Sequence, residues 1–155
     1  MITKTDKHQY YFEVQLNWKE GRKGLLSAHD AGRSIEVATP PEFPGGVPDM
    51  WSPEHLFLSS LSSCLMTTYL AIAEKKRLVI GNFTCNAIGQ IQLVEGHLEF
   101  TTINLFPTIT VEKEEDIPVA NEVLLKTYKH CIVANSIKPL LVHHGEVLVE
   151  RRAVA

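Results

Sequence analysis

The stretch SPEHLFLSSLSSCLMTTYLAIAEKK, residues 52–76, decides how the rest of the chain can fold. It carries no charged residue over the eighteen positions 56–73. Ser52 is suited to cap free backbone amides, and Pro53 at the first helical position loses no hydrogen bond. The pattern therefore predicts one long helix that ends near residue 76, with a single cysteine, Cys64, in its middle.

The length of this uncharged run raises the question of a membrane span. Its hydroxyl side chains make it too polar for a bilayer, so we expect a helix buried by protein and no membrane partner. A helix that is small or apolar on nearly all sides is more than one chain of 155 residues can cover, which favours a homodimer. The hydroxyl side chains are those of Ser59, Ser60, Ser62, Ser63, Thr67 and Thr68.

Length and composition indicate one soluble domain over residues 1–155. The 15 basic and 18 acidic residues give a net charge of -3, which gives no reason to expect a nucleic-acid partner. The N-terminal residues lack the apolar segment of a secretory signal, so we expect a cytoplasmic protein.

The residues before the helix show patterns that are typical of a small sheet. Residues 10–18 alternate apolar and polar side chains, which predicts a half-buried strand. A glycine-containing turn at 19–24 and two short strands at 25–30 and 34–39 complete a three-stranded meander. The proline-rich residues 40–49 predict a loop that leads into the long helix.

The half after the helix begins with a long hairpin. Residues 79–94 and 97–112 predict its two strands, with irregularities expected at Gly81, Gly89 and Pro107.

Two further helices and a strand are predicted after the hairpin. Asp116 is expected to cap a helix over residues 117–130, followed by a short helix at 131–139 and a last strand at 144–152. The resulting order, βββ-α-ββ-α-α-β, lacks βαβ alternation and predicts an α+β fold with antiparallel sheets around the long central helix. The expected buried positions of the 117–130 helix are Val119 or Ala120, Val123, Leu124 and Tyr128.

Three cysteines, Cys64, Cys85 and Cys131, are too few and too widely spaced for a disulfide framework or a CxxC metal site. A lone cysteine in a helix or strand is most often a small core residue, which is the simplest interpretation of Cys85 and an alternative for Cys64. Cys131 differs because it opens the predicted short helix, where free amides and the adjacent His130 are expected to lower its pKa.

Glu54 and Arg22 are the charged candidates for a site. A glutamate in the first turn of a helix commonly serves the helix dipole, and an arginine in a turn is commonly solvated. Glu54 is ten residues before Cys64, which is about 15 Å along a helix, so the two cannot touch within one chain. If the two share a site, we expect Glu54 of one chain to meet Cys64 of the other across antiparallel copies of the helix in a symmetric dimer.

Three stretches together resemble the OsmC/Ohr family of osmotically inducible and organic hydroperoxide resistance proteins. They are the long helix with Cys64, the segment KHCIVANSIK at 129–138, and NWKEGRKGLLSA at 17–28. The resemblance implies an intertwined α+β homodimer with two cysteine-based peroxidase sites at its interface. It also implies a dithiol reductant such as a lipoyl protein, and neither a cofactor nor a metal.

On this resemblance Cys64 would be the peroxidatic thiol and Cys131 the resolving thiol. Arg22 and Glu54 would hold Cys64 as the thiolate. A thiolate that attacks a peroxide becomes a sulfenic acid, which condenses with a second thiol to form a disulfide.

The substrate-binding candidates are apolar residues that precede the long helix. They would favour organic hydroperoxides over hydrogen peroxide, or alternatively only seal the dimer. These residues are Phe43, Val47, Met50 and Trp51.

Two positions depart from the family pattern. Ile132 follows the second cysteine where many relatives have proline, and Arg33 in AGRS competes with Arg22 for the arginine role. The alternative function is a module without catalytic activity that binds an apolar ligand at the dimer interface. That alternative predicts that Cys64 and Cys131 lie too far apart to form a disulfide.

Overall fold

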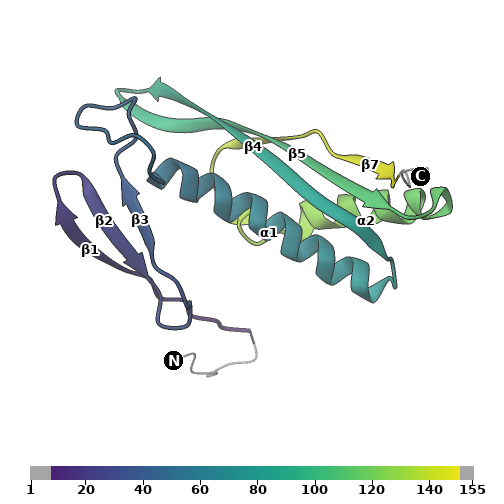
Figure 1. Cartoon of the computed structure of the whole chain (residues 1–155). Helices are drawn as coiled ribbons and strands as arrows, with labels where there is room; N and C mark the ends of the chain where they lie inside the picture. Colours follow the sequence, from purple (N-terminus) through teal and green to yellow (C-terminus); the bar gives the residue numbers. More distant parts are fainter. Residues whose placement is uncertain (1–7, 151–155) are drawn as a thin grey trace, which may run out of the picture. The chain divides into compact units, whose positions relative to one another are not determined.

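The structure, a computed structural model, describes residues 8–150. The chain divides into two compact units, the first ending at Leu56 and the second beginning at Phe57 (Figure 1). The first unit holds a three-stranded sheet, and the second holds a four-stranded sheet with two helices on it. The predicted α+β class is confirmed.

The first unit is the predicted meander. Its strands β1 (Gln15–Glu20), β2 (Lys23–Ser27) and β3 (Ile35–Ala38) pair antiparallel in chain order. The prediction that the first strand starts at residue 10 is wrong, since residues 10–14 form no strand. All of β1 is exposed, so among the described residues nothing covers the apolar face that its alternation indicates.

Helix α1 (Pro53–Lys75) begins where the sequence predicts. The buried hydroxyl of Ser52 accepts a hydrogen bond from the amide of His55 at 3.2 Å, which confirms the cap. Apolar residues at a spacing of four bury one face of the helix, while Met66 and Leu70 on its other sides stay exposed. The buried residues are Leu61, Leu65, Tyr69 and Ala73.

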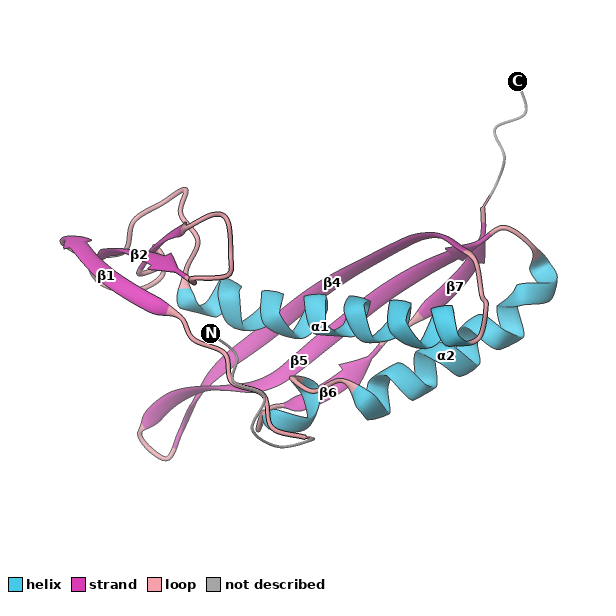
Figure 2. Ribbon diagram, turned by 90° about the horizontal axis from the view of Figure 1, so that it is seen from below, coloured by secondary structure: helices cyan, strands magenta, loops and turns pink. Residues whose placement is uncertain are grey.

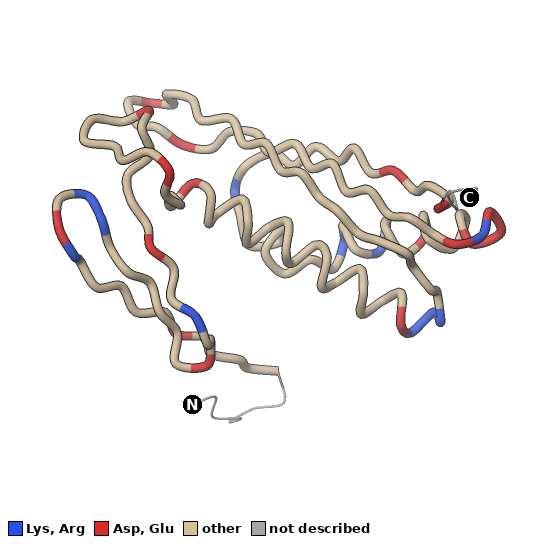
Figure 3. The backbone as a smooth tube through the Cα atoms, in the orientation of Figure 1, with Lys and Arg blue, Asp and Glu red and all other residues tan. Residues whose placement is uncertain are grey.

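By length and composition alone, α1 is the one helix of the described chain that could cross a membrane, a property that core helices of soluble proteins share. Figure 3 shows that its charged residues lie only near its two ends.

The second unit is built on the predicted hairpin, β4 (Ile80–Val94) and β5 (His97–Val111). The sheet is mixed, and the prediction of antiparallel pairing alone is wrong for it. Strands β6 (Leu140–His143) and β7 (Glu146–Val149) both pair parallel with β5, because the chain crosses back over α2 before it re-enters the sheet. Strand β6, which has only four residues, is not among the predicted strands.

The hairpin is irregular at Gly81, as predicted, and again between Gln90 and Ile91. The predicted irregularities at Gly89 and Pro107 are wrong, since both residues pair in register. Gly89 has a different role: a Cβ there would lie 2.5 Å from the ring of Phe100, so the glycine makes room for this side chain.

Helix α2 (Ile117–His130) follows a single 3-10 turn, η1 (Glu114–Asp116). The predicted cap is wrong because Asp116 is itself part of this turn and its side chain makes no capping hydrogen bond. The helix predicted at 131–139 is reduced to an open turn and one 3-10 turn, η2 (Ala134–Ser136).

Both helices cover the same side of the four-stranded sheet (Figure 2). The phenolic hydroxyl of Tyr69 ties α1 to α2 by donating to the carbonyl of Ala120 at 3.2 Å. Residues 151 and 152 of the predicted last strand lie outside the described residues.

Candidate active site

The structure brings Cys64 and Cys131 together in the second unit. Cys64 lies in the middle of α1, and Cys131 is the residue at which α2 ends. Cys131 is fully buried, Cys64 is half-buried, and both pack in one apolar cluster with Leu61 and Leu65. The two thiols are free and each alters the pKa of the other, so they lie close enough to act on each other.

The surroundings of the Cys64 sulfur lower the pKa of its thiol. Burial acts to raise the pKa of this thiol, but the amide of Val133, the thiol of Cys131, the hydroxyl of Thr68 and the amide of Ile132 together lower its pKa below the ordinary value. The Thr68 oxygen lies 3.9 Å from the Cys64 sulfur. Donors of this kind stabilise the thiolate, which is the nucleophilic form.

The prediction that Cys131 has the lowered pKa is wrong. Burial and, after it, the negative charge on Cys64 raise the pKa of Cys131 to about 11, although the amides of Ala134 and Val133 offset part of this. Its own amide donates to the carbonyl of Thr127 at 3.0 Å. The free amides expected here do exist, but those of residues 132 and 133 serve Cys64.

The turn after α2 is fixed by local hydrogen bonds. The amide of Asn135 donates to the carbonyl of Cys131 at 3.0 Å, and its side chain donates to the carbonyl of Lys129 at 3.0 Å. The hydroxyl of Ser136 donates to the carbonyl of Ile132 at 2.7 Å. These bonds use carbonyl groups and leave the amides of residues 132 and 133 without a backbone partner among the described residues.

Arg22 and Glu54 belong to the first unit. Arg22 is exposed in the turn between β1 and β2, and its side chain lies along Gly45, where an added Cβ would be 3.2 Å from Nε. Since β3 runs antiparallel to β2, its end and the following loop lie at the Arg22 end of this sheet. The carboxylate of Glu54 has one buried oxygen, Oε2, that accepts no hydrogen bond from the described residues.

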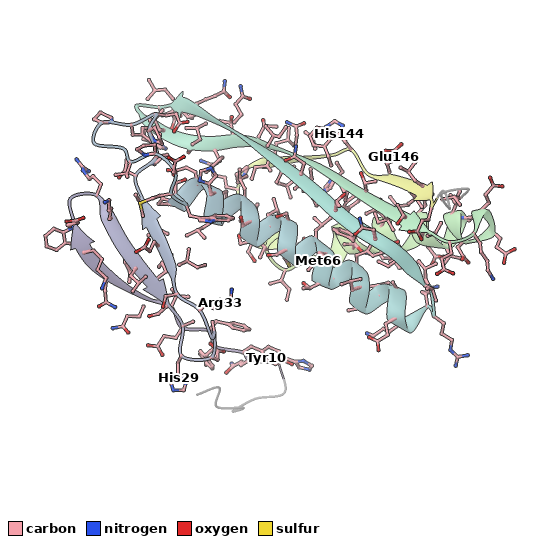
Figure 4. All side chains as sticks on the ribbon, in the orientation of Figure 1. Tyr10, His29, Arg33, Met66, His144 and Glu146 are labelled. Atoms are coloured by element: carbon pink, nitrogen blue, oxygen red, sulfur yellow. The ribbon has the colours of Figure 1, made fainter. Side chains whose placement is uncertain are left out.

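Arg33 lies in the loop between β2 and β3, at the opposite end of the same sheet (Figure 4). Of the two arginines, Arg22 is therefore the one that shares an end of its unit with the loop leading to α1.

The loop at residues 40–49 is confirmed. In it or just after it lie the apolar candidates Phe43, Val47, Met50 and Trp51. The amide of Val47 donates to the carbonyl of Thr39 at 2.9 Å, and Trp51 keeps 52% of its surface exposed. Met50 and Trp51 line two hollows of about 420 and 400 Å³. The predicted site residues thus form two groups, one in each unit.

Two adjacent histidines, His143 and His144, make contacts of their own in the second unit. The ring of His143 packs on Tyr128, and His144 stacks on Phe106 and shares a hydrogen bond with Asn104 at 2.9 Å. In Figure 4, His144 is on the side of the sheet opposite α1.

Comparison with known proteins identifies the family. A model of the OsmC-like proteins matches residues 46–142, which is more than half of the chain and includes both site cysteines. The chain belongs to the OsmC-like family. A search of the curated proteins finds none with significant similarity.

Solved OsmC-like structures share the fold. An OsmC-like protein of unknown function from Vibrio cholerae is 24% identical with a TM-score of 0.74, over 90% of this chain and 97% of that one. An organic hydroperoxide resistance protein from Elizabethkingia anophelis is 20% identical with a TM-score of 0.72, over 94% and 100%. One from Legionella pneumophila is 19% identical with a TM-score of 0.70, over 92% and 100%.

Proposed function

We propose that this OsmC-like protein is a thiol peroxidase that reduces organic hydroperoxides to alcohols through Cys64 and Cys131. The observation that carries the proposal is the pair of free thiols packed in one apolar cluster, in which Cys64 has the lowered pKa and Cys131 the raised one. Such a division gives one thiolate nucleophile and one thiol held in reserve beside it.

The reaction has two steps. The Cys64 thiolate attacks the outer peroxide oxygen, so that an S–O bond forms, the O–O bond breaks, and the alkoxide takes up a proton and leaves as the alcohol. The sulfur of Cys131 then attacks the sulfenic acid of Cys64. A disulfide forms, and the hydroxyl leaves as water with the proton of Cys131.

An external dithiol must supply two electrons and two protons to restore both thiols. We propose a lipoyl-type dithiol for this step, and the reducing cytoplasm as the compartment.

A homodimer completes the proposed site. Two surfaces support it: all of β1 is exposed with apolar side chains such as Trp18, and α1 leaves Met66 and Leu70 exposed beside the buried face. In the dimer, Arg22 and Glu54 of one chain would approach Cys64 of the other. The Glu54 oxygen that lacks a donor in the described chain is suited to bind a guanidinium group. Phe43, Val47, Met50 and Trp51 would contact the organic part of the substrate.

A binding module without catalytic activity is the rival function. It predicts widely separated cysteines, and the packing of Cys64 and Cys131 in one apolar cluster speaks against it.

Counting thiols tests the proposal directly. Reduced protein receives less than one equivalent of cumene hydroperoxide, remaining thiols are alkylated, and intact mass and peptide mapping locate the loss. We expect rapid loss of two thiols, at Cys64 and Cys131, and a slower loss with hydrogen peroxide. The matched control, Cys85→Ser, should lose the same two. Survival of all thiols in the wild-type chain would refute the peroxidase.

A further inference from the structure

Four of the six serine and threonine side chains of α1 donate to a carbonyl of the preceding turn, whereas Thr68 does not. Ser60 donates to the carbonyl of Phe57 at 2.7 Å, and Ser63 donates to that of Ser59 at 2.7 Å. Thr67 donates to the carbonyl of Cys64 at 3.1 Å. Bonds of this kind to the preceding turn are the usual choice of Ser and Thr inside helices. The hydroxyl of Thr68 instead lies against the Cys64 sulfur.

The position of Thr68 on the helix explains this contact. A residue four positions after Cys64 lies on the same helix face, so its side chain reaches the sulfur without bending the backbone. An ionised sulfur can only accept hydrogen bonds, which makes the hydroxyl the donor to the thiolate.

Thr68 also differs from the other donors in the element that carries it. The Val133 and Ile132 amides and the Cys131 thiol all belong to the turn after α2. That turn carries Cys131, so it is the element exposed to strain when a disulfide with Cys64 forms. Thr68 is on α1 with Cys64, so its distance to the sulfur does not depend on the turn.

Thr68 also lines a hollow. The hollow has a volume of about 480 Å³ and lies between α1 and α2, with Ile72, Lys75, Lys126 and His130 among its other residues. Cys64 is not among the residues that line it, so Thr68 is the residue that contacts both the sulfur and the hollow.

We propose that Thr68 is a positioning residue for Cys64, whose hydroxyl donates to the thiolate and orients the sulfur independently of the turn that carries Cys131. The inference rests on the proposed function for its catalytic meaning, since only a peroxidase needs this thiolate. The property that it predicts belongs to the thiol alone and can be measured without any peroxide.

The test is the pH dependence of Cys64 alkylation in the full-length protein, followed by peptide mapping. Thr68→Val keeps the shape of the side chain and removes the donor, whereas Thr68→Ser keeps the donor. The matched control is Thr67→Val, which removes a neighbouring hydroxyl that bonds only to a carbonyl. Thr68→Ala provides a second variant without the donor in case the valine disturbs folding, which circular dichroism would reveal.

We expect Thr68→Val and Thr68→Ala to move the alkylation profile to higher pH and to slow alkylation at pH 7 by about threefold to tenfold. Thr68→Ser and Thr67→Val should match the wild type. A wild-type profile in folded Thr68→Val or Thr68→Ala, or an equal shift in Thr67→Val, would overturn the inference. The alkylation profile can shift as expected even if all thiols of the wild-type protein survive peroxide. In that case the inference on Thr68 stands and the proposed peroxidase function is refuted.

Discussion

Cys64 and Cys85 pack against the same apolar cluster, yet their environments act on them in opposite directions. Both are half-buried. Burial raises the pKa of the Cys85 thiol and only the backbone of Phe106 opposes it, whereas four donors lower the pKa of Cys64. Hydrogen-bond donors together with shallower burial therefore separate Cys64 from Cys85.

Secondary structure explains why the donors are unequal. Cys85 is inside the long strand β4, opposite Pro107 of β5, where neighbouring amides are used by the sheet. Cys64 faces the point where α2 stops, and the amides of Ile132 and Val133 have no carbonyl partner in the following turn. An interrupted helix end thus provides what a regular strand cannot.

The largest expected effect is that of replacing Cys131, which should change the product that peroxide forms at Cys64. In Cys131→Ser, we expect peroxide to leave Cys64 as a sulfenic acid that dimedone captures, with no disulfide inside the chain, because no resolving sulfur remains. In Cys85→Ser, we expect a full yield of disulfide and no dimedone adduct. Mass spectrometry of the treated proteins distinguishes the two. A disulfide between Cys64 and Cys85 in Cys131→Ser would contradict the assigned roles.

The order of alkylation should sharpen the comparison in the unmodified chain. At pH 7, iodoacetamide should label Cys64 before Cys85 and Cys131, by at least about tenfold. Since only the thiolate reacts, labelling of Cys64 should fall as the pH drops through its lowered pKa. Cys131 should gain reactivity only towards pH 11, near its raised pKa. Labelling of Cys131 first at pH 7 would show that the thiolate is on the other sulfur.

Much of the fold could be predicted from local patterns. The capped start of α1 at Ser52 and the hairpin turn at Glu95 and Gly96 each depend on a few neighbouring residues, and both are confirmed. The parallel strands β6 and β7 could not be predicted in this way. Their pairing with β5 is a long-range choice that follows from how α2 carries the chain back.

The site could be predicted only as a set of residues. The sequence indicated Cys64 and Cys131 as site cysteines. The lowered pKa was expected at Cys131, because free amides at a helix start were taken to act on the residue that opens the helix. The direction of the amides depends on the extended conformation of Cys131, with φ -66° and ψ 114°, which turns the chain back towards α1. Thr68 was missed as a donor because it looked like one of many hydroxyls in α1. The signal that was available is its spacing of four residues from Cys64.

The smallest expected effect concerns Ile132, the position where many relatives have proline. The side chain of Ile132 is 75% exposed, so its amide is the feature that matters to Cys64. Ile132→Pro removes this amide, and the extended backbone of Cys131 is one that a residue before proline favours. We expect Cys64 alkylation at pH 7 to slow by roughly twofold to threefold, because three of its four donors remain.

Ile132→Ala is the control for this change, since it removes the side chain and keeps the amide. Its alkylation profile should match the wild type. If Ile132→Ala slows Cys64 as much as Ile132→Pro does, the exposed side chain and not the amide supports the thiolate. The contrast with Cys85 would then depend on packing at the turn as well as on donors. If only proline has an effect, this chain holds its thiolate with one more backbone donor than a relative with proline at this position can supply.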